Sequence, residues 1–164
     1  MSGMRQPREE VDGKVLVGAS EYVRLPAWRI GRVRAKVDTG ARTSALHVDN
    51  IVELPGDQVR FEVVLHHHGS DRRVQVEAPI ARRSTVKSSS GQMEHRIFVR
   101  TRMVLGAVER EIEISLTSRM TMRYRMLLGR SALAGRFVVD PGRRYYETRA
   151  ERSAVKAAKE RRHP

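Results

Sequence analysis

Apolar and charged residues alternate one by one along several stretches of this chain, most clearly over residues 108–116. Successive side chains of a β-strand point to opposite faces, so this alternation predicts a strand with one buried and one exposed face. The two faces differ in chemistry, with Ile112, Ile114 and Leu116 opposite Glu109, Glu111 and Glu113. Few segments show the 3.6-residue period of a helix, and the pattern therefore points to a mainly β fold.

The same period of two recurs along the chain, with turn formers such as Pro55-Gly56-Asp57 and Pro141-Gly142 between the strands. The residues expected to face inward are Val33, Ala35 and Val37; Val59, Phe61, Val63 and Leu65; Val74 and Val76; and Ile97 and Val99, with Phe98 on the outward side. Many short strands at regular spacing predict a sandwich or a small barrel. One short helix is expected at residues 131–134, with Ser131 as its cap after Gly129.

A length of 164 residues suits a single domain. We expect a flexible N-terminus at residues 1–13, which carry little to bury, and a folded domain at residues 14–148. Residues 149–164 are alanine-rich and basic without an apolar face, which indicates a mobile tail.

The chain contains no cysteine, so disulfides, thiolate metal sites and cysteine nucleophiles are excluded. The first residues, MSGMRQPREEVDG, lack the apolar core of a secretory signal, and no stretch has the length of a membrane helix. The expected location is therefore the cytoplasm, without a membrane partner.

The formal net charge is +13, which by itself suggests an anionic partner such as nucleic acid or an acidic polypeptide. The arginines are spread along the chain, however, and no nucleic-acid-binding motif organises them. Aromatic residues make up only 5% of the chain, which leaves little to stack bases on. We therefore expect a solvated basic surface, and we do not expect nucleic acid as a partner.

The stretch KVDTGARTSALH places Asp38-Thr39-Gly40 where an alternating pattern ends. A strand that runs into this tripeptide would present the Asp38 carboxylate at the open end of a sheet, with Thr39 and Gly40 shaping a tight turn. All three residue types are common in turns, so the tripeptide alone is a weak indication of catalysis. Downstream, Met126-Leu127-Leu128 is an apolar run that leads into Gly129-Arg130 and then into a second apolar run, Phe137-Val138-Val139-Asp140.

Taken together, these motifs resemble the retropepsin-like aspartic proteases. More closely, AKVDTGARTSALHV, MRYRMLLGRSAL and GRFVVDP are similar to a bacterial family labelled ATP-dependent zinc protease, which is associated with ATP-grasp ligases that add glutamate to a ribosomal protein. The resemblance covers about residues 31–146. It implies an all-β, retropepsin-like closed barrel with one short helix and a single Asp-Thr-Gly lobe.

Carried over to this chain, the resemblance makes Asp38 the catalytic residue of a peptide hydrolase. Thr39, Gly40 and Ala41 would support its loop, and a strand with Leu128, Gly129 and Arg130 would pack beneath it, Arg130 as an ion-pair partner. Residues 83–95 would form a flap over the substrate, with its binding residues at Lys87, Ser88, Ser89, Ser90 and Gly91.

Aspartic protease chemistry needs two carboxylates, one ionised to activate water and one protonated to bond the scissile carbonyl. The chain has one Asp-Thr-Gly, and Asp140 lacks such a loop, so we interpret Asp140 as structural. We expect a homodimer with one Asp38 from each subunit. Its substrate would be a peptide or protein, for which the basic surface and the family association suggest a glutamate-rich tail. One alternative is a non-catalytic adaptor that binds a glutamate ligase or a ribosomal protein. A third reading is a nucleic-acid-binding β-barrel, whose binding would depend steeply on salt and would not require Asp38.

Zinc and ATP find no support in the sequence, because neither a His-Glu-x-x-His helix nor a phosphate-binding Gly-x-x-x-x-Gly-Lys loop is present. The run of His66, His67 and His68 could capture a metal, but no further ligand follows at a suitable spacing. We expect no cofactor and no metal site. His47 and His95 stand alone in the sequence and are interpreted as strand residues.

Overall fold

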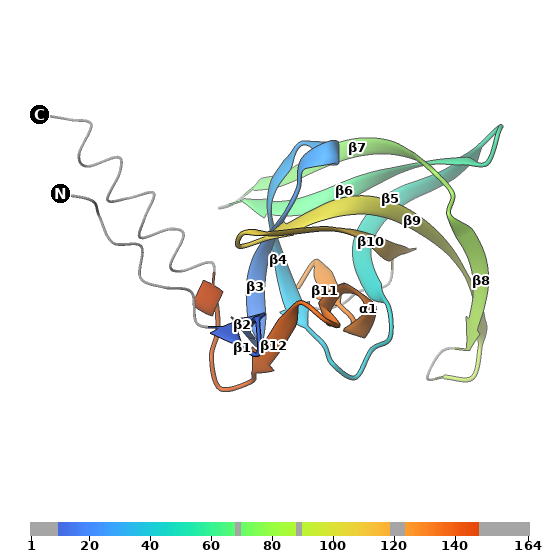
Figure 1. The fold of residues 1–164 in the computed structure, drawn as a ribbon. Coiled ribbons are helices and arrows are strands. Elements are labelled where there is room, and N and C mark those ends of the chain that lie inside the picture. Colours follow the sequence, from blue (N-terminus) through green and yellow to red (C-terminus); the bar gives the residue numbers. More distant parts are fainter. Residues whose placement is uncertain (1–9, 68–69, 88–89, 119–123, 148–164) are drawn as a thin grey trace, which may run out of the picture.

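The computed structural model describes residues 10–67, 70–87, 90–118 and 124–147. Over these residues the chain is mainly β, with one short α-helix, as predicted (Figure 1). The elements are β1 (Glu10–Val11), β2 (Lys14–Gly18), β3 (Ser20–Leu25), the 3-10 turn η1 (Pro26–Trp28), β4 (Ile30–Val37), β5 (Ser44–Leu54), β6 (Gln58–His67), β7 (Ser70–Pro79), β8 (Arg82–Lys87), β9 (Met93–Leu105), β10 (Val108–Thr117), β11 (Met126–Leu128), α1 (Arg130–Leu133) and β12 (Phe137–Asp140).

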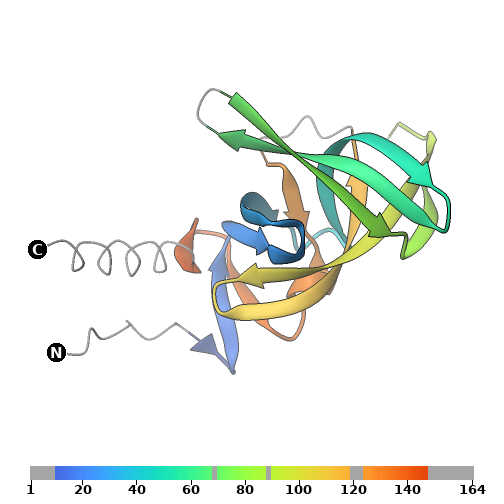
Figure 2. The same cartoon turned by 90° about the horizontal axis from the view of Figure 1, so that it is seen from above.

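Six strands close into a barrel in the order β5, β10, β9, β3, β4, β11 and back to β5 (Figures 1 and 2). Most neighbours are antiparallel, but β10 runs parallel to β5 and β11 runs parallel to β4. The short strand β11 is the piece that joins β4 to β5. Closure removes the free sheet edges that an open arrangement of these strands would expose.

The alternation in the sequence sorts side chains as predicted. Val33 and Ala35 on β4, Phe61 on β6 and Ile114 on β10 are all buried, and they belong to one hydrophobic core. Leu65, Val74 and Ile97, also predicted to face inward, are only partly buried. Phe98 departs from the prediction, because it lies on the outward side of β9 and is nevertheless buried. The Arg82 guanidinium covers its ring, with Cζ 3.6 Å from the ring centroid, so a neighbouring long side chain buries it.

Two antiparallel extensions project from the barrel, because β5 and β9 continue beyond the parts of these strands that form the barrel. The second half of β5 pairs with β6, which pairs with β7. The first half of β9 pairs with β8. Lys87 lies opposite Met93 at one end of this pairing, and Arg82 lies opposite Phe98 at the other. This second hairpin is the one that the sequence predicted over residues 83–95, and it forms the long arm at the right of Figure 1.

A separate sheet of β1, β2 and β12 ties the two ends of the described chain together. Strand pairing begins at Glu10 rather than at the predicted domain boundary at Lys14. At the other end Glu147 is buried, and its N–H donates to the Glu21 carboxylate at 3.1 Å, which also accepts the Gly18 N–H at 3.0 Å. The predicted tail at residues 149–164 lies outside the described residues.

The single helix begins one residue earlier than expected, at Arg130. Its N-cap is Gly129, and no side chain caps it, so the prediction that Ser131 caps the helix is wrong. None of the helices in the described part of the chain is long and apolar enough to cross a membrane.

Replacing Glu21 by alanine should lower the free energy of unfolding by about 3 kcal/mol, because two buried N–H groups lose their side-chain acceptor. Urea titration of the full chain measures this change. The matched control is Glu111→Ala, which removes an exposed glutamate and should change stability by less than about 0.5 kcal/mol. Equal losses in the two variants would contradict the role given to Glu21.

Candidate active site

Asp38 lies directly after β4, at the point where β4 and β11 end side by side. Its backbone N–H donates to the Leu128 carbonyl at 2.8 Å, which continues the parallel ladder by one bond. Its side chain is half-buried, and Oδ1 accepts the Gly40 N–H at 3.0 Å. The turn thus fixes the orientation of the carboxylate through its own backbone.

The loop of residues 38–43 is held from below by α1. The N–H groups of Arg130 and Ser131 donate to the carbonyls of Ala41 at 2.8 Å and Arg42 at 3.0 Å. These are N–H groups of the first helical turn, which have no acceptor within a helix. The loop carbonyls therefore accept the N–H groups of the first helical turn, and the same hydrogen bonds hold the loop in place.

The side chain of Arg130 also hydrogen-bonds the loop. Nη1 donates to the carbonyls of Thr39 at 3.1 Å and Gly40 at 3.0 Å. We predicted Arg130 as an ion-pair partner in a strand beneath the loop. The structure corrects both points, because the guanidinium bonds backbone carbonyls and the strand ends at Leu128, with Arg130 already in α1.

Gly129 lets two backbone segments approach more closely than a side chain would allow. A Cβ at this position would lie 2.5 Å from the carbonyl carbon and oxygen of Thr43. The Gly129 N–H donates to the buried Ser44 Oγ at 3.1 Å. Gly129 thus sets the distance between the end of β11 and the loop that carries Asp38.

Asp38 makes no ion pair within the described residues, and the same part of the chain provides no hydrogen-bond partner for its Oδ2. Such a carboxylate has one oxygen fixed and one available to accept a proton from water. Asp140 is different, since Oδ1 accepts the Gly142 N–H at 2.9 Å and Oδ2 lies 3.1 Å from Arg143 Nε. Both of its oxygens stabilise a turn, in agreement with the structural role expected for it.

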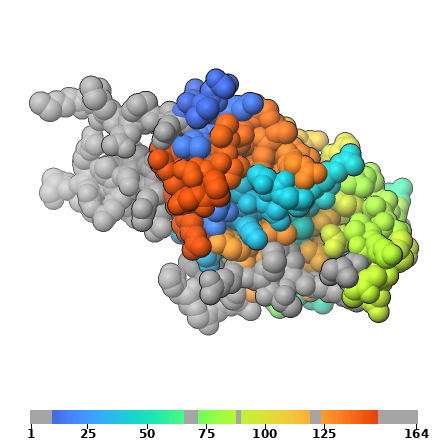
Figure 3. Space-filling model, turned by 90° about the horizontal axis from the view of Figure 1, so that it is seen from below, coloured from blue at the N-terminus to red at the C-terminus, as the bar shows by residue number. Residues whose placement is uncertain are grey.

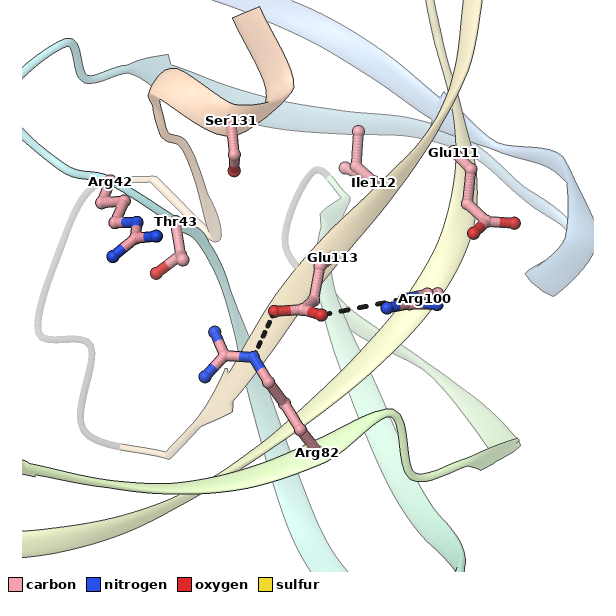
Figure 4. Close-up of a pocket in the computed structure, with 8 residues that line it drawn as sticks. All are labelled: Arg42, Thr43, Arg82, Arg100, Glu111, Ile112, Glu113 and Ser131. Atoms are coloured by element: carbon pink, nitrogen blue, oxygen red, sulfur yellow. Dashed lines mark hydrogen bonds and ion pairs between the residues drawn. The ribbon is translucent and has the colours of Figure 1, made fainter.

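A pocket of about 480 Å³ lies beside the loop, and Asp38 is not among the residues that line it. Figure 4 shows Glu113 at its centre, bonded to Arg82 at 2.6 Å and 3.7 Å from Arg100. Its remaining lining residues come from the loop, β10 and α1, and they are Arg42, Thr43, Glu111, Ile112 and Ser131. Sequence reasoning missed this group because its members come from distant segments: Arg42, Thr43 and Ser131 lie in quoted motifs and Glu111 to Glu113 in an alternating strand, but nothing local indicates that they meet.

Figure 3 shows the face on which the chain after β4 lies between the terminal segments and the β8–β9 hairpin. Of the predicted flap residues, Lys87 ends β8, and Ser90 and Gly91 lie in the turn, where Gly91 has a φ of 84°. Ser88 and Ser89 lie outside the described residues. Met93, which begins β9, is 63% exposed near the tip, an apolar contact surface that the sequence analysis did not single out.

His47 is buried on β5, as expected for a strand residue, with Nε2 3.8 Å from Asp49 Oδ1. Burial lowers the pKa of His47, and the nearby positive charge of Arg125 lowers it further, against the opposing effect of Asp49. Its Nδ1 has no hydrogen-bond partner among the described residues. The imidazole is therefore neutral at neutral pH.

Groups of three or more side chains that could hold a metal do not occur in the part of the chain that the structure describes. The side chains of His66, His67 and His68 are outside that part. The described residues around Asp38 offer one carboxylate with backbone donors, which suits the handling of a water molecule better than the binding of a metal ion.

Comparison with known proteins places these features in context. A family model described as RimB-like, retropepsin-like aspartic endopeptidase RimB, matches residues 16–150. A protein named probable alpha-L-glutamate ligase from Parasynechococcus marenigrum is 43% identical over 133 residues, which cover 78% of this chain and 28% of the relative. One of the same name from Shewanella halifaxensis is 38% identical over 135 residues, covering 79% and 29%.

The chain thus spans less than a third of the length of these curated relatives. Among solved structures, a Legionella pneumophila protein of unknown function matches with a TM-score of 0.66 and 28% identity. The match covers 80% of this chain and 97% of that one. The fold described above therefore accounts for nearly all of that protein.

The Gly129→Ala variant should lose about 3 kcal/mol of stability, because the new methyl group meets the Thr43 backbone, which cannot move aside freely. Denaturant unfolding measures the loss. Gly31→Ala is the control, since a Cβ there meets nothing within 4 Å, and its stability should stay within about 0.5 kcal/mol. A Gly129→Ala protein as stable as the Gly31→Ala protein would show that the close approach is not needed.

The stability of the chain should fall as the pH drops through the ordinary titration range of histidine, in part because of His47. Since its pKa is lower in the folded state, the unfolded chain binds the proton first, and protonation favours unfolding. His47→Gln should flatten this part of the stability curve between neutral pH and about pH 5. A wild-type slope in His47→Gln would refute the assignment.

Proposed function

Because this chain belongs to the RimB-like family of retropepsin-like aspartic endopeptidases, we propose that it hydrolyses peptide bonds with Asp38 as the catalytic residue. The observation that carries the proposal is the state of the Asp38 carboxylate. The Gly40 N–H donates to one of its oxygens, and backbone hydrogen bonds hold Asp38 at the end of β4. The carboxylate forms no ion pair with any of the described residues.

The reaction needs a second carboxylate, which we propose is Asp38 of a second copy of the chain. Asp140 is bonded at both oxygens and is therefore not a candidate. In a symmetric dimer the two loops face each other across the two-fold axis and the two carboxylates share one proton. The neutral His47 is buried within the strand and takes no part as a base.

In the proposed mechanism, the ionised Asp38 accepts a proton from water, and the water oxygen attacks the carbonyl carbon of the scissile bond. The protonated Asp38 of the other subunit donates its proton to the carbonyl oxygen, so the tetrahedral intermediate is neutral. The first carboxyl then gives its proton to the leaving amine, while the second takes its proton back as the carbonyl reforms. Water and two carboxyl groups suffice, and no metal or nucleotide enters the mechanism.

We propose an acidic, glutamate-rich peptide as the substrate class, closed in by the β8–β9 hairpin. Support comes from the pocket beside the loop, where Arg42 lies without an ion pair among the described residues and Arg82 and Arg100 share the single carboxylate of Glu113. With Glu111 and Glu113 as its carboxylates, the lining with Arg42, Arg82 and Arg100 keeps one positive charge in excess, which favours a side-chain carboxylate of the substrate. The relatives named probable alpha-L-glutamate ligase support a substrate that contains glutamate.

A second candidate is an adaptor without activity, and one observation favours it. The matching segment forms only part of relatives that are named ligases, so the same fold occurs within a longer chain of another named activity. In that case this chain would bind a glutamate ligase or its ribosomal protein substrate through the hairpin and the loop, and Asp38 would not be required.

Asp38→Asn should reduce peptide cleavage by about a thousandfold or more while leaving the fold intact, because the amide oxygen can still accept the Gly40 N–H. The assay follows a diverse peptide library that includes glutamate-rich members, from mildly acidic to neutral pH, by mass spectrometry. Asp57→Asn is the control, since Asp57 is 79% exposed in a turn, and it should cleave as the wild type does.

The dimer is tested in the same assay by dilution, since activity per chain should fall when the dimer dissociates. A folded, dimeric wild type that cleaves no peptide would favour the adaptor. Cleavage that survives Asp38→Asn would remove Asp38 from the mechanism.

A further inference from the structure

The chain contains four tyrosines, and the structure brings them close to arginines. Tyr22 and Tyr145 stack with their ring centroids 4.9 Å apart and an angle of 19° between them. The Arg32 guanidinium lies 3.7 Å from the centroid of Tyr22. The Arg34 guanidinium lies 4.6 Å from that of Tyr124 and 5.9 Å from that of Tyr145. We call these five residues the arginine–tyrosine stack.

Three separate parts of the chain build the stack. Tyr22 and Arg34 are direct partners across β3 and β4, on the outward face of the barrel. Tyr124 precedes β11, and its hydroxyl lies 2.7 Å from Ser20 Oγ. Tyr145 follows β12, and its N–H donates to the Ser20 carbonyl at 2.7 Å in the left-handed conformation, with a φ of 53° that is uncommon for an aromatic residue.

The charges around the stack are not balanced. The outward face of β3 and β4 carries Arg24, Arg32, Arg34 and Lys36, which we call the basic face, and none of the four forms an ion pair with any described residue. Several arginines of other strands differ, since carboxylates lie beside them in the pairs Arg60–Glu77, Arg73–Asp49, Arg82–Glu113, Arg83–Glu53 and Arg102–Glu109. Part of the excess positive charge of the chain is therefore concentrated on one surface.

The stack also prepares its arginines for a ligand. Stacking occupies the flat side of the Arg32 guanidinium and leaves its N–H edges free to bond phosphate or carboxylate oxygens in pairs, whereas Arg34 also bonds the side chains of Tyr124 and Tyr145. Because ring contacts already restrict Arg32 and Arg34, less side-chain entropy is lost when they bind. Strands β3 and β4 lie on the side of the barrel away from the tip of the β8–β9 hairpin (Figures 1 and 2), and none of the four basic residues lines the pocket beside the Asp38 loop.

We propose that the basic face and the arginine–tyrosine stack together bind single-stranded nucleic acid. Phosphates supply the negative charge that the four basic residues lack, and bases supply planar groups that extend a stack of rings and guanidinium groups. An acidic peptide has the charge without the rings, and a second copy of this face would bring like charges together. The low aromatic content of the sequence argued against such a partner, but that argument loses its force where the tyrosines are concentrated.

The test measures binding of a fluorescent oligouridine to the full chain by anisotropy over a range of salt concentrations. The double variant Arg32→Gln/Arg34→Gln should bind at least about tenfold more weakly, and the slope of log affinity against log salt should decrease by about 1.4. The control Arg60→Gln/Arg83→Gln removes the same charge from paired arginines and should bind within about twofold of the wild type. Asp38→Asn should bind as the wild type does, whether or not peptide cleavage is found.

Lys36→Gln is a second test that does not depend on the folding of the double variant. Because Lys36 is exposed, this single replacement should weaken oligouridine binding without disturbing the fold. The proposal fails if oligouridine does not bind, or if both double variants lose affinity equally, since the charge would then act diffusely. It fails as well if a polyglutamate peptide binds this face and oligouridine does not. Loss of dimers in Arg32→Gln/Arg34→Gln, without loss of oligouridine binding, would assign the face to a second copy of the chain.

Discussion

The parallel pairing of β4 with β11 is the interaction on which the rest of the site depends. It brings Val37 beside Leu128, so that Asp38 bonds the Leu128 carbonyl and leaves the ladder at the same level as Gly129. Since Gly129 has no side chain, the Thr43 backbone packs directly against it, and the first turn of α1 bonds the loop carbonyls. One short strand thus closes the barrel and also fixes the carboxylate.

The arginines of this chain occupy two different environments. Along β5 to β10 many of them pair with carboxylates at the surface, where each pair contributes little to stability and mainly cancels charge. On β3 and β4 they lie against tyrosine rings or solvent instead. Part of the excess positive charge is therefore concentrated on the basic face, and none of the four residues of this face lines the pocket beside the Asp38 loop.

Several features could be predicted because they depend on neighbours in the sequence. The alternation of Val33, Ala35 and Val37 predicted which side of β4 is buried, and the resemblance implied a flap at residues 83–95, where the β8–β9 hairpin lies. The errors arose where distant residues decide. Phe98 is buried by Arg82 from another strand, and Arg130 bonds the carbonyls of Thr39 and Gly40 because α1 packs beneath their loop. Neither contact leaves a periodic signal in the sequence.

The sequence by itself determined that the fold is β, that Asp38 follows a strand, and that Gly129-Arg130 follows another, because strand periodicity and turn chemistry are local properties. Only the tertiary structure decided that these two strand ends meet, that Glu21 ties the two ends of the described chain together, and that the tyrosines pack with arginines. These contacts join residues up to 126 positions apart. Barrel closure sets which of them meet, and closure is a property of the whole set of strands rather than of any one of them.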